Sequence, residues 1–178
     1  MIYITRHGQT EWNLKNKIMG KADIPLNETG LKESGQLRDM VDELQIDLIV
    51  CSPLLRAKQT AEIINSKKSI KIIYDDRISE RDYGEFEGKS IDDFDFSAYW
   101  NYYENKTYKY AENVRDFFSR IYEFFDEIIK KYFNKNILII THAGVGMSAL
   151  CYFNQFIPEK SLIETTYFSN GEIKSFEI

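Results

Sequence analysis

The sequence predicts an α/β fold: a three-layer α/β/α sandwich around a mostly parallel sheet with an antiparallel edge strand. Short β-rich apolar runs alternate along the chain with longer segments of helical spacing. This alternation is typical of parallel strands that are joined by helices. A parallel sheet of this kind is covered by helices on both faces. Near the C-terminus, an Asn-Gly pair between two further apolar runs indicates a hairpin, and hence an antiparallel strand.

The predicted strands are short runs of aliphatic and β-branched residues. Four of them are expected to form the parallel part of the sheet: residues 2–5, 47–51, 70–74 and 137–141. Two more runs, residues 163–168 and 173–178, flank Asn170 and Gly171. This pair favours a type I′ hairpin turn, so we expect one of the flanking runs to lie at an edge of the sheet.

The predicted helices lie between these runs, at residues 29–44, 53–65, 112–132 and 143–153. For the second helix, Ser52 is the expected N-cap and Pro53 takes the first helical position. The third helix has a broad apolar face, built at steps of three and four residues. Its members are Val114, Phe117, Phe118, Ile121, Phe125, Ile128 and Tyr132. We interpret these aromatic side chains as core.

The length of 178 residues fits one domain of ordinary size, residues 1–178, with a lid-like insertion at residues 85–111. Within the insertion, residues 92–110 are dense in aromatic and acidic side chains and have no clean period. The segment is too polar for a core element, and we interpret it as a lid or excursion over one end of the sheet. An ordinary surface insertion and a homodimer contact are equal alternatives.

Composition excludes several classes of function. The net charge of −5 and the pI of about 5.2 argue against a nucleic-acid-binding protein, which would carry clustered basic residues. No apolar run approaches the ~20 residues of a membrane span, and no targeting segment is visible. We therefore expect a cytoplasmic protein without a membrane partner. Cys51 and Cys151 lie among apolar neighbours and are interpreted as small buried side chains in a reducing compartment.

The only two histidines, His7 and His142, each follow a predicted strand directly. Arg6 lies at the first of these strand ends, and Arg56 lies just past a third strand end. In open α/β sheets, ligands bind beyond the carboxyl ends of the strands. Two guanidinium groups at such an edge suit the oxygens of a phosphate group. The sequence therefore predicts a phosphate pocket that contains imidazole.

Imidazole in a phosphate pocket points to nucleophilic catalysis. The attacking imidazole must be neutral, and neighbouring guanidinium groups disfavour its protonated form. The leaving oxygen then needs a proton from a general acid. The residues alone leave three candidates for that acid: Glu80, Asp82 and Asp76.

Five motifs in chain order resemble the histidine phosphatase superfamily, in its phosphoglycerate-mutase-like branch. They are RHGQTEWN at 6–13, DIPLNETGL at 23–31, SPLLRAKQTA at 52–61, SERDYG at 79–84 with Glu87-Gly88, and THAG at 141–144. The resemblance implies that family's sheet-and-helix sandwich. It also implies a metal-independent phosphoryl transfer on a small phosphomonoester, with no cofactor.

The resemblance assigns roles to individual residues. His7 would be the phosphorylated nucleophile and Glu80 the proton donor. The phosphoryl oxygens would be held by Arg6, Arg56 and His142, with Asn13 as a further phosphate contact and Tyr83 as a substrate-binding residue. Met19 departs from the family pattern, because relatives usually have a polar residue there; a polar substrate contact is thereby put in question.

Several competing functions fit these residues less well. A cysteine-phosphatase loop at Cys51–Arg56 is rejected, because it has four residues instead of five between Cys and Arg and lacks glycine. A metal hydrolase would need clustered ligands, which the scattered acids do not provide. A phospho-binding module without catalysis would be free to lose His7 or Glu80.

The remaining alternative is a phosphoglycerate mutase, which must retain a phosphorylated product. Residues 85–110 form a short, acidic segment whose only basic residues are Lys89, Lys106 and Lys109. Such a segment is poorly suited to holding an anionic glycerate phosphate. The sequence therefore favours a phosphatase over a mutase.

Overall fold

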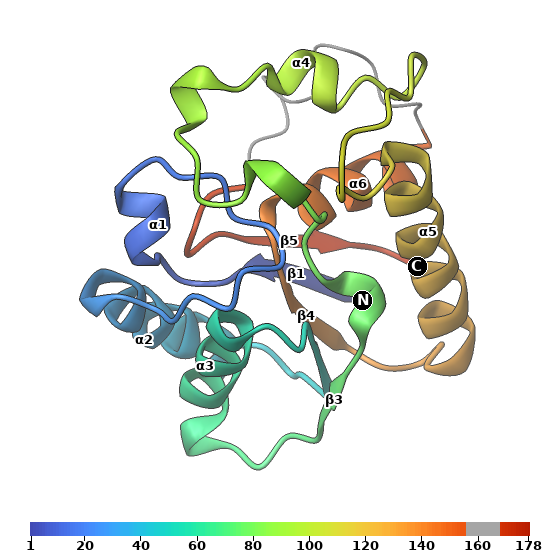
Figure 1. Ribbon diagram of the computed structural model, residues 1–178. Helices are drawn as coiled ribbons and strands as arrows, with labels where there is room; N and C mark the ends of the chain where they lie inside the picture. The colour runs from blue at the N-terminus through green and yellow to red at the C-terminus, as the bar shows by residue number, and fades with distance from the viewer. Residues whose placement is uncertain (156–167) are drawn as a thin grey trace.

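A five-stranded sheet forms the centre of the computed structural model, which describes residues 1–155 and 168–178 (Figure 1). Its spatial order is β3-β2-β4-β1-β5. The strands are β1 Ile2–Arg6, β2 Leu48–Cys51, β3 Ile72–Tyr74, β4 Ile137–Thr141 and β5 Ile173–Phe176. The first four pair in parallel, whereas β5 pairs antiparallel with β1 at the edge. The predicted α/β fold, mostly parallel with an antiparallel edge strand, is confirmed.

The register of the central strands brings three carboxyl ends to the same level. Strand β1 pairs with β4 up to Arg6 and Thr141, and β2 pairs with β4 up to Cys51 and Ile140. The ladder continues one residue further, because the backbone N–H of His7 donates to Thr141 and that of Ser52 donates to Ile140, each at 3.0 Å. The residues that follow β1, β2 and β4 are therefore neighbours in space.

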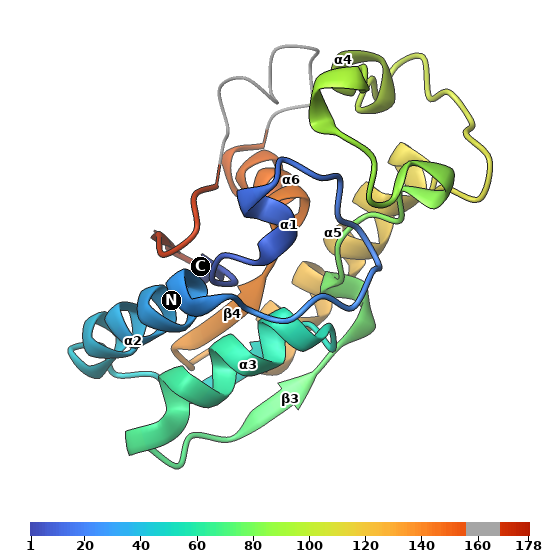
Figure 2. The same ribbon diagram turned by 60° about the vertical axis from the view of Figure 1, so that its left-hand side comes forward.

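Four longer helices cover the two faces of the sheet. Figures 1 and 2 show α2 (Glu28–Asp42) and α3 (Leu55–Ile64) on one side, and α5 (Val114–Lys131) and α6 (Ala143–Asn154) on the other. Because neighbouring residues of a strand face opposite ways, each strand serves two apolar cores. The α5–α6 core takes Val50 and Ile139, and the α2–α3 core takes Ile49 and Leu138.

The start of α3 differs from the prediction. The helix begins at Leu55 after Leu54, and no side chain caps it, so the expected N-cap role of Ser52 is wrong. Ser52 lies at the end of β2, where its hydroxyl is 2.7 Å from the Nε2 atom of His142. The Ser52 oxygen also accepts the backbone N–H of Leu54 at 3.4 Å, which lies before the first helical residue, so it bonds to no N–H of α3 itself.

The predicted C-terminal hairpin agrees with the structure in its second strand but not in its turn. Residues 163–167 of the first predicted run lie outside the described residues, whereas β5 confirms the second run. Gly171 has a φ of 76°, but Asn170 is not among the described residues with positive φ, so the predicted type I′ turn is wrong. Asn170 instead forms a parallel bridge with Arg6, and its side-chain amide donates to the His7 carbonyl.

The insertion at residues 85–111 lies beyond one end of the sheet and includes the short helix α4 (Phe96–Tyr99), at the top of Figure 1. The expectation that residues 92–110 are too polar for the core is wrong, because Tyr99 and Trp100 are buried. The guanidinium of Arg81 lies 3.6 Å from the Tyr99 ring centroid and donates to the Tyr99 carbonyl. The Arg81 cation, which lies over the rings of Tyr99 and Trp100, thus joins the insertion to the main body.

A second short helix, α1 (Glu11–Leu14), follows β1 and carries a capping box between Thr10 and Asn13. Within the described part of the chain, no helix combines the length and apolarity that crossing a bilayer requires.

Candidate active site

The two histidines meet at the carboxyl edge of the sheet. His7 follows β1 and His142 follows β4, and their ring centroids are 5.2 Å apart. Both side chains are almost completely buried. The predicted convergence at one rim therefore results from the parallel register of two adjacent strands.

The hydrogen bonds of His7 define which ring nitrogen is free to react. Its Nδ1 atom is 2.7 Å from the carbonyl oxygen of Gly8, which can only accept, so Nδ1 carries the hydrogen. In the neutral ring, Nε2 then has a lone pair. That lone pair accepts a hydrogen bond from the Nε–H group of Arg56 at 3.1 Å.

The electrostatic surroundings keep both imidazoles neutral. Burial, followed by the positive charges of Arg56 and Arg6, holds the pKa of His7 well below its usual value. Burial and the charge of Arg56 likewise hold the pKa of His142 well below its usual value. The sequence predicted the effect of the guanidinium groups, but the larger cause is desolvation.

Arg56 is itself fixed by backbone oxygens. Its Nη2 atom donates to the Gly20 carbonyl at 2.8 Å, and its Nη1 atom donates to the Ala22 carbonyl at 2.9 Å. The side chain is fully buried, and burial lowers the pKa of Arg56 to about 10. Arg6 donates to the Phe168 carbonyl at 3.1 Å. Both predicted arginines are therefore present at the rim in fixed orientations.

Glu80 is the acid that the structure brings to the pocket. Its carboxylate accepts the backbone N–H of Arg81 at 2.8 Å and that of Gly144 at 3.1 Å. Asp82 caps the Gly84 backbone instead, and neither Asp82 nor Asp76 lines the cavity. Of the three candidate acids, Glu80 alone therefore lines the cavity.

The approach of Glu80 to α6 is close. A Cβ atom on Gly144 would lie 2.4 Å from the Glu80 Oε1 atom and 2.8 Å from the Trp100 ring. Glycine is therefore required at this position for space. From α5, Arg120 donates to the carbonyls of Ser79 at 2.9 Å and Glu80 at 3.3 Å, which fixes the backbone that carries the acid.

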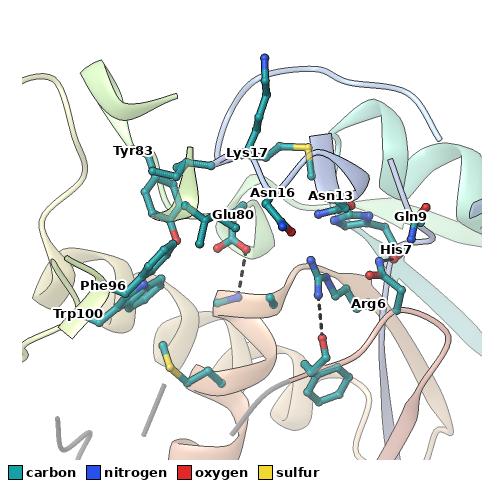
Figure 3. A pocket seen from close by; sticks show the side chains of 18 residues that line it. Arg6, His7, Gln9, Asn13, Asn16, Lys17, Glu80, Tyr83, Phe96 and Trp100 are labelled. Atoms are coloured by element: carbon teal, nitrogen blue, oxygen red, sulfur yellow. Dashed lines mark hydrogen bonds between the residues drawn. The ribbon is translucent and has the colours of Figure 1, made fainter. Parts of the chain in front are cut away.

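Arg6, His7 and Glu80 line a cavity of about 410 Å³, whereas the buried side chains of Arg56 and His142 are not part of its lining. Figure 3 shows Tyr83, Phe96 and Trp100 on one side, Arg6 and His7 on the other, and Glu80 between them. The rest of the lining is mixed in polarity: Gln9, Asn13, Asn16, Lys17, Ile18, Met19, Ile91, Ala143, Gly144, Met147, Phe168 and Asn170. The predicted substrate-binding residues Asn13 and Tyr83 both lie here, as does Met19.

Asn13 presents a donor to this cavity. Its Oδ1 atom accepts hydrogen bonds from the Thr10 backbone N–H and hydroxyl, each at 3.0 Å. Because the oxygen is occupied in this way, the amide NH₂ is the group left for a ligand.

Two residues of the site were missed by sequence reasoning. Ser52 was interpreted as a helix cap, although it contacts His142. Glu87 was quoted only as part of a motif, although its carboxylate accepts several backbone N–H groups beside Arg56. The Glu87-Gly88 pair of the fourth motif was the available signal, but the backbone partners of Glu87 at residues 20–22 are 65 to 67 residues away in sequence.

Cys51 and Cys151 are free and buried, as predicted, and burial raises the pKa of both thiols. Across residues 1–155 and 168–178, no three His, Cys, Asp or Glu side chains gather as metal ligands would.

Comparison with known proteins gives a family and several relatives. The model of the histidine phosphatase superfamily (branch 1) matches residues 2–178. An uncharacterized phosphatase of Bacillus subtilis, PhoE, is 37% identical over 156 residues, which cover 84% of this chain and 74% of PhoE. A probable phosphoglycerate mutase of Escherichia coli, GpmB, is 38% identical over 91 residues, which cover 51% of this chain and 42% of GpmB. The solved structure of Bacillus stearothermophilus YhfR superposes with a TM-score of 0.87 at 28% identity, covering 97% of this chain and 88% of YhfR.

Proposed function

Because this chain belongs to the histidine phosphatase superfamily, we propose that it hydrolyses small phosphomonoesters through a phosphohistidine on His7, without a metal ion. The hydrogen bonding of the His7 ring is the observation that carries this proposal. A neutral imidazole has its Nδ1–H held by a carbonyl and its Nε2 lone pair directed at a guanidinium. This is the arrangement that a nucleophile needs when its target is an anionic phosphoryl group.

The first chemical step forms the phosphoenzyme. When the substrate binds, the Arg56 Nε–H moves from the Nε2 lone pair of His7 to a phosphoryl oxygen. The freed lone pair attacks phosphorus, and the bond between phosphorus and the ester oxygen breaks. The leaving oxygen keeps the bonding electrons and takes a proton from Glu80. Each Glu80 oxygen accepts one backbone N–H and has a second lone pair on which the proton can be carried. The dianionic substrate favours the protonated form of its carboxyl neighbour.

The second step returns the enzyme to its starting state. Water attacks phosphorus, its proton passes to the Glu80 carboxylate, and the electrons of the P–N bond return to Nε2 of His7. Inorganic phosphate is the product. The same carboxyl group thus serves as acid and then as base.

We propose that three donors hold the phosphoryl oxygens. The Nε–H of Arg56 already occupies the position in front of His7 Nε2, and Arg6 lines the same wall. The third is His142. The Leu54 backbone N–H donates to Ser52 Oγ at 3.4 Å, so we assign the Ser52 hydroxyl hydrogen to His142 Nε2. His142 Nδ1 then carries a hydrogen and has no acceptor within the described residues.

The apolar side of the cavity supports a leaving group with aromatic or aliphatic character. Tyr83, Phe96 and Trp100 lie there, and Arg6 and Lys17 are the only cationic side chains that the described residues contribute to the lining. Retention of a glycerate carboxylate needs more positive charge than Lys17 supplies. The same feature favours hydrolysis over mutase activity.

Phosphoenzyme trapping tests the function. Wild-type protein mixed rapidly with p-nitrophenyl phosphate should give a burst of p-nitrophenol and a phosphoprotein that is labile in acid and stable in base. Turnover should be unchanged after EDTA treatment. Absence of a phosphoprotein together with sustained turnover would contradict the covalent route, and loss of turnover with EDTA would contradict metal independence.

A second assay separates the phosphatase from the mutase, which the partial match to GpmB keeps as an alternative. The enzyme is given 3-phosphoglycerate with a trace of bisphosphoglycerate, and 2-phosphoglycerate and free phosphate are followed together. We expect phosphate release to dominate. Faster isomer formation would assign a mutase while leaving the His7 chemistry intact. The cytoplasmic location, the homodimer and the lack of nucleic-acid or membrane partners stay predictions.

A further inference from the structure

The carboxylate of Glu87 binds a cluster of backbone N–H groups. Its Oε1 atom accepts from Lys21 at 2.8 Å, and its Oε2 atom accepts from Gly20 at 3.1 Å and Ala22 at 3.3 Å. Oε1 also accepts from Tyr83 at 3.3 Å. One side chain therefore joins the segment 20–22 to the turn that follows Glu80.

The segment 20–22 is the same one that holds Arg56. The carbonyls of Gly20 and Ala22 accept from the two terminal nitrogens of Arg56, at 2.8 and 2.9 Å. These bonds leave the Arg56 Nε–H directed at His7 Nε2. The Gly20–Lys21 peptide unit links the two groups directly, because its N–H donates to Glu87 and its carbonyl accepts from Arg56. A chain of hydrogen bonds thus runs from Glu87 through this peptide unit to the guanidinium, and from there to His7.

We propose that Glu87 is a positioning residue for phosphoryl transfer, which fixes segment 20–22 so that its carbonyls orient Arg56 toward the phosphoryl group on His7. This inference rests on the proposed function for its kinetic consequences. Glu87 touches neither substrate nor reacting atoms in this account. It acts only through the loop and Arg56.

The chemistry of the side chain suits this role. An ionised carboxylate is purely an acceptor, so it can receive several N–H groups that converge on it. Glutamine at position 87 would present an NH₂ group to some of these donors and leave them unpaired. The negative charge also favours the buried Arg56 cation, since Glu87 is among the groups that raise the pKa of Arg56 against burial.

Close packing makes the contact specific. A Cβ atom on Gly20 would lie 2.3 Å from Glu87 Oε1 and 2.3 Å from the Arg81 carbonyl oxygen. The loop therefore has little room to find another position when the carboxylate is present. Without it, the Gly20 and Ala22 carbonyls lose the contact that fixes their direction.

The test is a double-mutant cycle between Glu87→Gln and Arg56→Lys. A positioning error of about 1 Å at the phosphoryl group costs about a hundredfold in rate, and we expect a loss of that order in kcat/KM for Glu87→Gln. Orthovanadate, measured by calorimetry, should bind more weakly by a similar factor. In the Arg56→Lys background, Glu87→Gln should change either quantity by less than about threefold, because the residue through which it acts is already altered.

The matched control is Asp47→Asn. The Asp47 carboxylate also accepts a backbone N–H, from Asn136 at 2.8 Å, but it precedes β2 and lies at the opposite ends of the strands. This variant should keep wild-type kcat/KM and orthovanadate affinity. Equal losses for Glu87→Gln with and without Arg56→Lys would overturn the proposal, because a merely structural carboxylate predicts additive effects.

A readout in ligand-free protein separates this inference from the proposed function. The ¹⁵N–¹H signal of the Arg56 Nε–H group should exchange slowly in wild type and in Asp47→Asn, and at least about tenfold faster in Glu87→Gln. An unchanged signal in Glu87→Gln would overturn the positioning role even if the enzyme is a phosphatase. Should Glu87→Gln not fold, Glu87→Asp keeps the charge on a shorter side chain. It must then show the same coupling to Arg56→Lys, and additive losses there would also refute the proposal.

Discussion

The two sides of the cavity are built by different means. The side with His7 and Arg56 is fixed by directed hydrogen bonds, which anchor the His7 ring to the Gly8 carbonyl after β1 and the Arg56 guanidinium to two carbonyls of the loop 20–22. The side with Phe96 and Trp100 is a cluster of rings in edge contact, such as Phe94 with Phe96 at 4.7 Å and Trp100 with Phe117 at 5.3 Å. Few other side chains can replace one that makes directed hydrogen bonds, whereas an apolar side chain in a packed cluster can be replaced by another of similar volume.

This contrast separates chemistry from substrate choice. The hydrogen-bonded side belongs to the sheet and its register, so its geometry follows from the fold. The aromatic side comes largely from the insertion, which is held to the body by Arg81. Changes on the first side should therefore alter the rate of all substrates, and changes on the second should alter which substrates are preferred.

The largest effect is expected from His7→Ala, which removes the nucleophile from the hydrogen-bonded side. Turnover of every phosphomonoester should fall by about three orders of magnitude or more, and no phosphoprotein should be trapped. Ser148→Ala is the control, because Ser148 is a buried serine of α6 outside the cavity lining. Near-normal turnover of His7→Ala would refute the covalent mechanism.

Glu80→Gln tests the residue that lies between the two sides. An alkyl phosphate needs a proton on its leaving oxygen, so its kcat should fall by about 10²–10⁴-fold. For p-nitrophenyl phosphate, whose leaving group barely needs a proton, the loss should be below about tenfold. Both substrates are measured on one preparation. Equal losses would move the acid role to another residue, and Asp82 is the next candidate.

Phe96→Ala tests the aromatic side alone. Loss of the ring from a partly buried position removes about 1–2 kcal/mol of apolar contact, so KM for p-nitrophenyl phosphate should rise about tenfold. Inhibition by inorganic phosphate should not change, because phosphate fills only the other side. Phe94→Ala is the matched control, since Phe94 packs on Phe96 but does not line the cavity. A weaker phosphate inhibition in Phe96→Ala would show that the two sides are not independent.

The last effect concerns stability and not catalysis, and it belongs to the hydrogen-bonded side. The folded-state pKa values of His7 and His142 lie well below the unfolded value of 6.5, so the folded state binds fewer protons. The stability that the two neutral rings contribute to the folded state is fully present above pH 6.5. It is lost as the pH falls from there toward the lowered pKa values. In that range the free energy of unfolding falls by about 1.4 kcal/mol per pH unit of acidification for each histidine.

Urea unfolding between pH 7.5 and 5.5 measures this slope. His7→Gln should reduce it by about half in the range below pH 6.5, because one of the two titrating rings is gone. Phe96→Ala should leave it unchanged, since that ring carries no titrating group. A wild-type stability that rises on acidification through this range would contradict the depressed pKa values.

Much of the site could be predicted because it depends on short stretches of sequence. A histidine or arginine directly after a strand is visible in the printed chain, and parallel strands bring their carboxyl ends to one edge. Arg6, His7, Arg56 and His142 were found in this way. Glu80 could not be separated from Asp82 and Asp76, because the three acids share one loop and differ only in where their side chains point.

The sequence by itself determined the layered fold, the edge at which the chemistry gathers and the residue types that gather there, because periodicity and strand ends are local properties. Only the tertiary structure decided the rest. It turned Ser52 from a helix cap into a partner of His142, kept Asn170 out of the predicted turn and buried Tyr99 in a segment that is polar on average. Each of these outcomes depends on a hydrogen bond or ring contact between residues distant along the chain, and such pairings have no local signature.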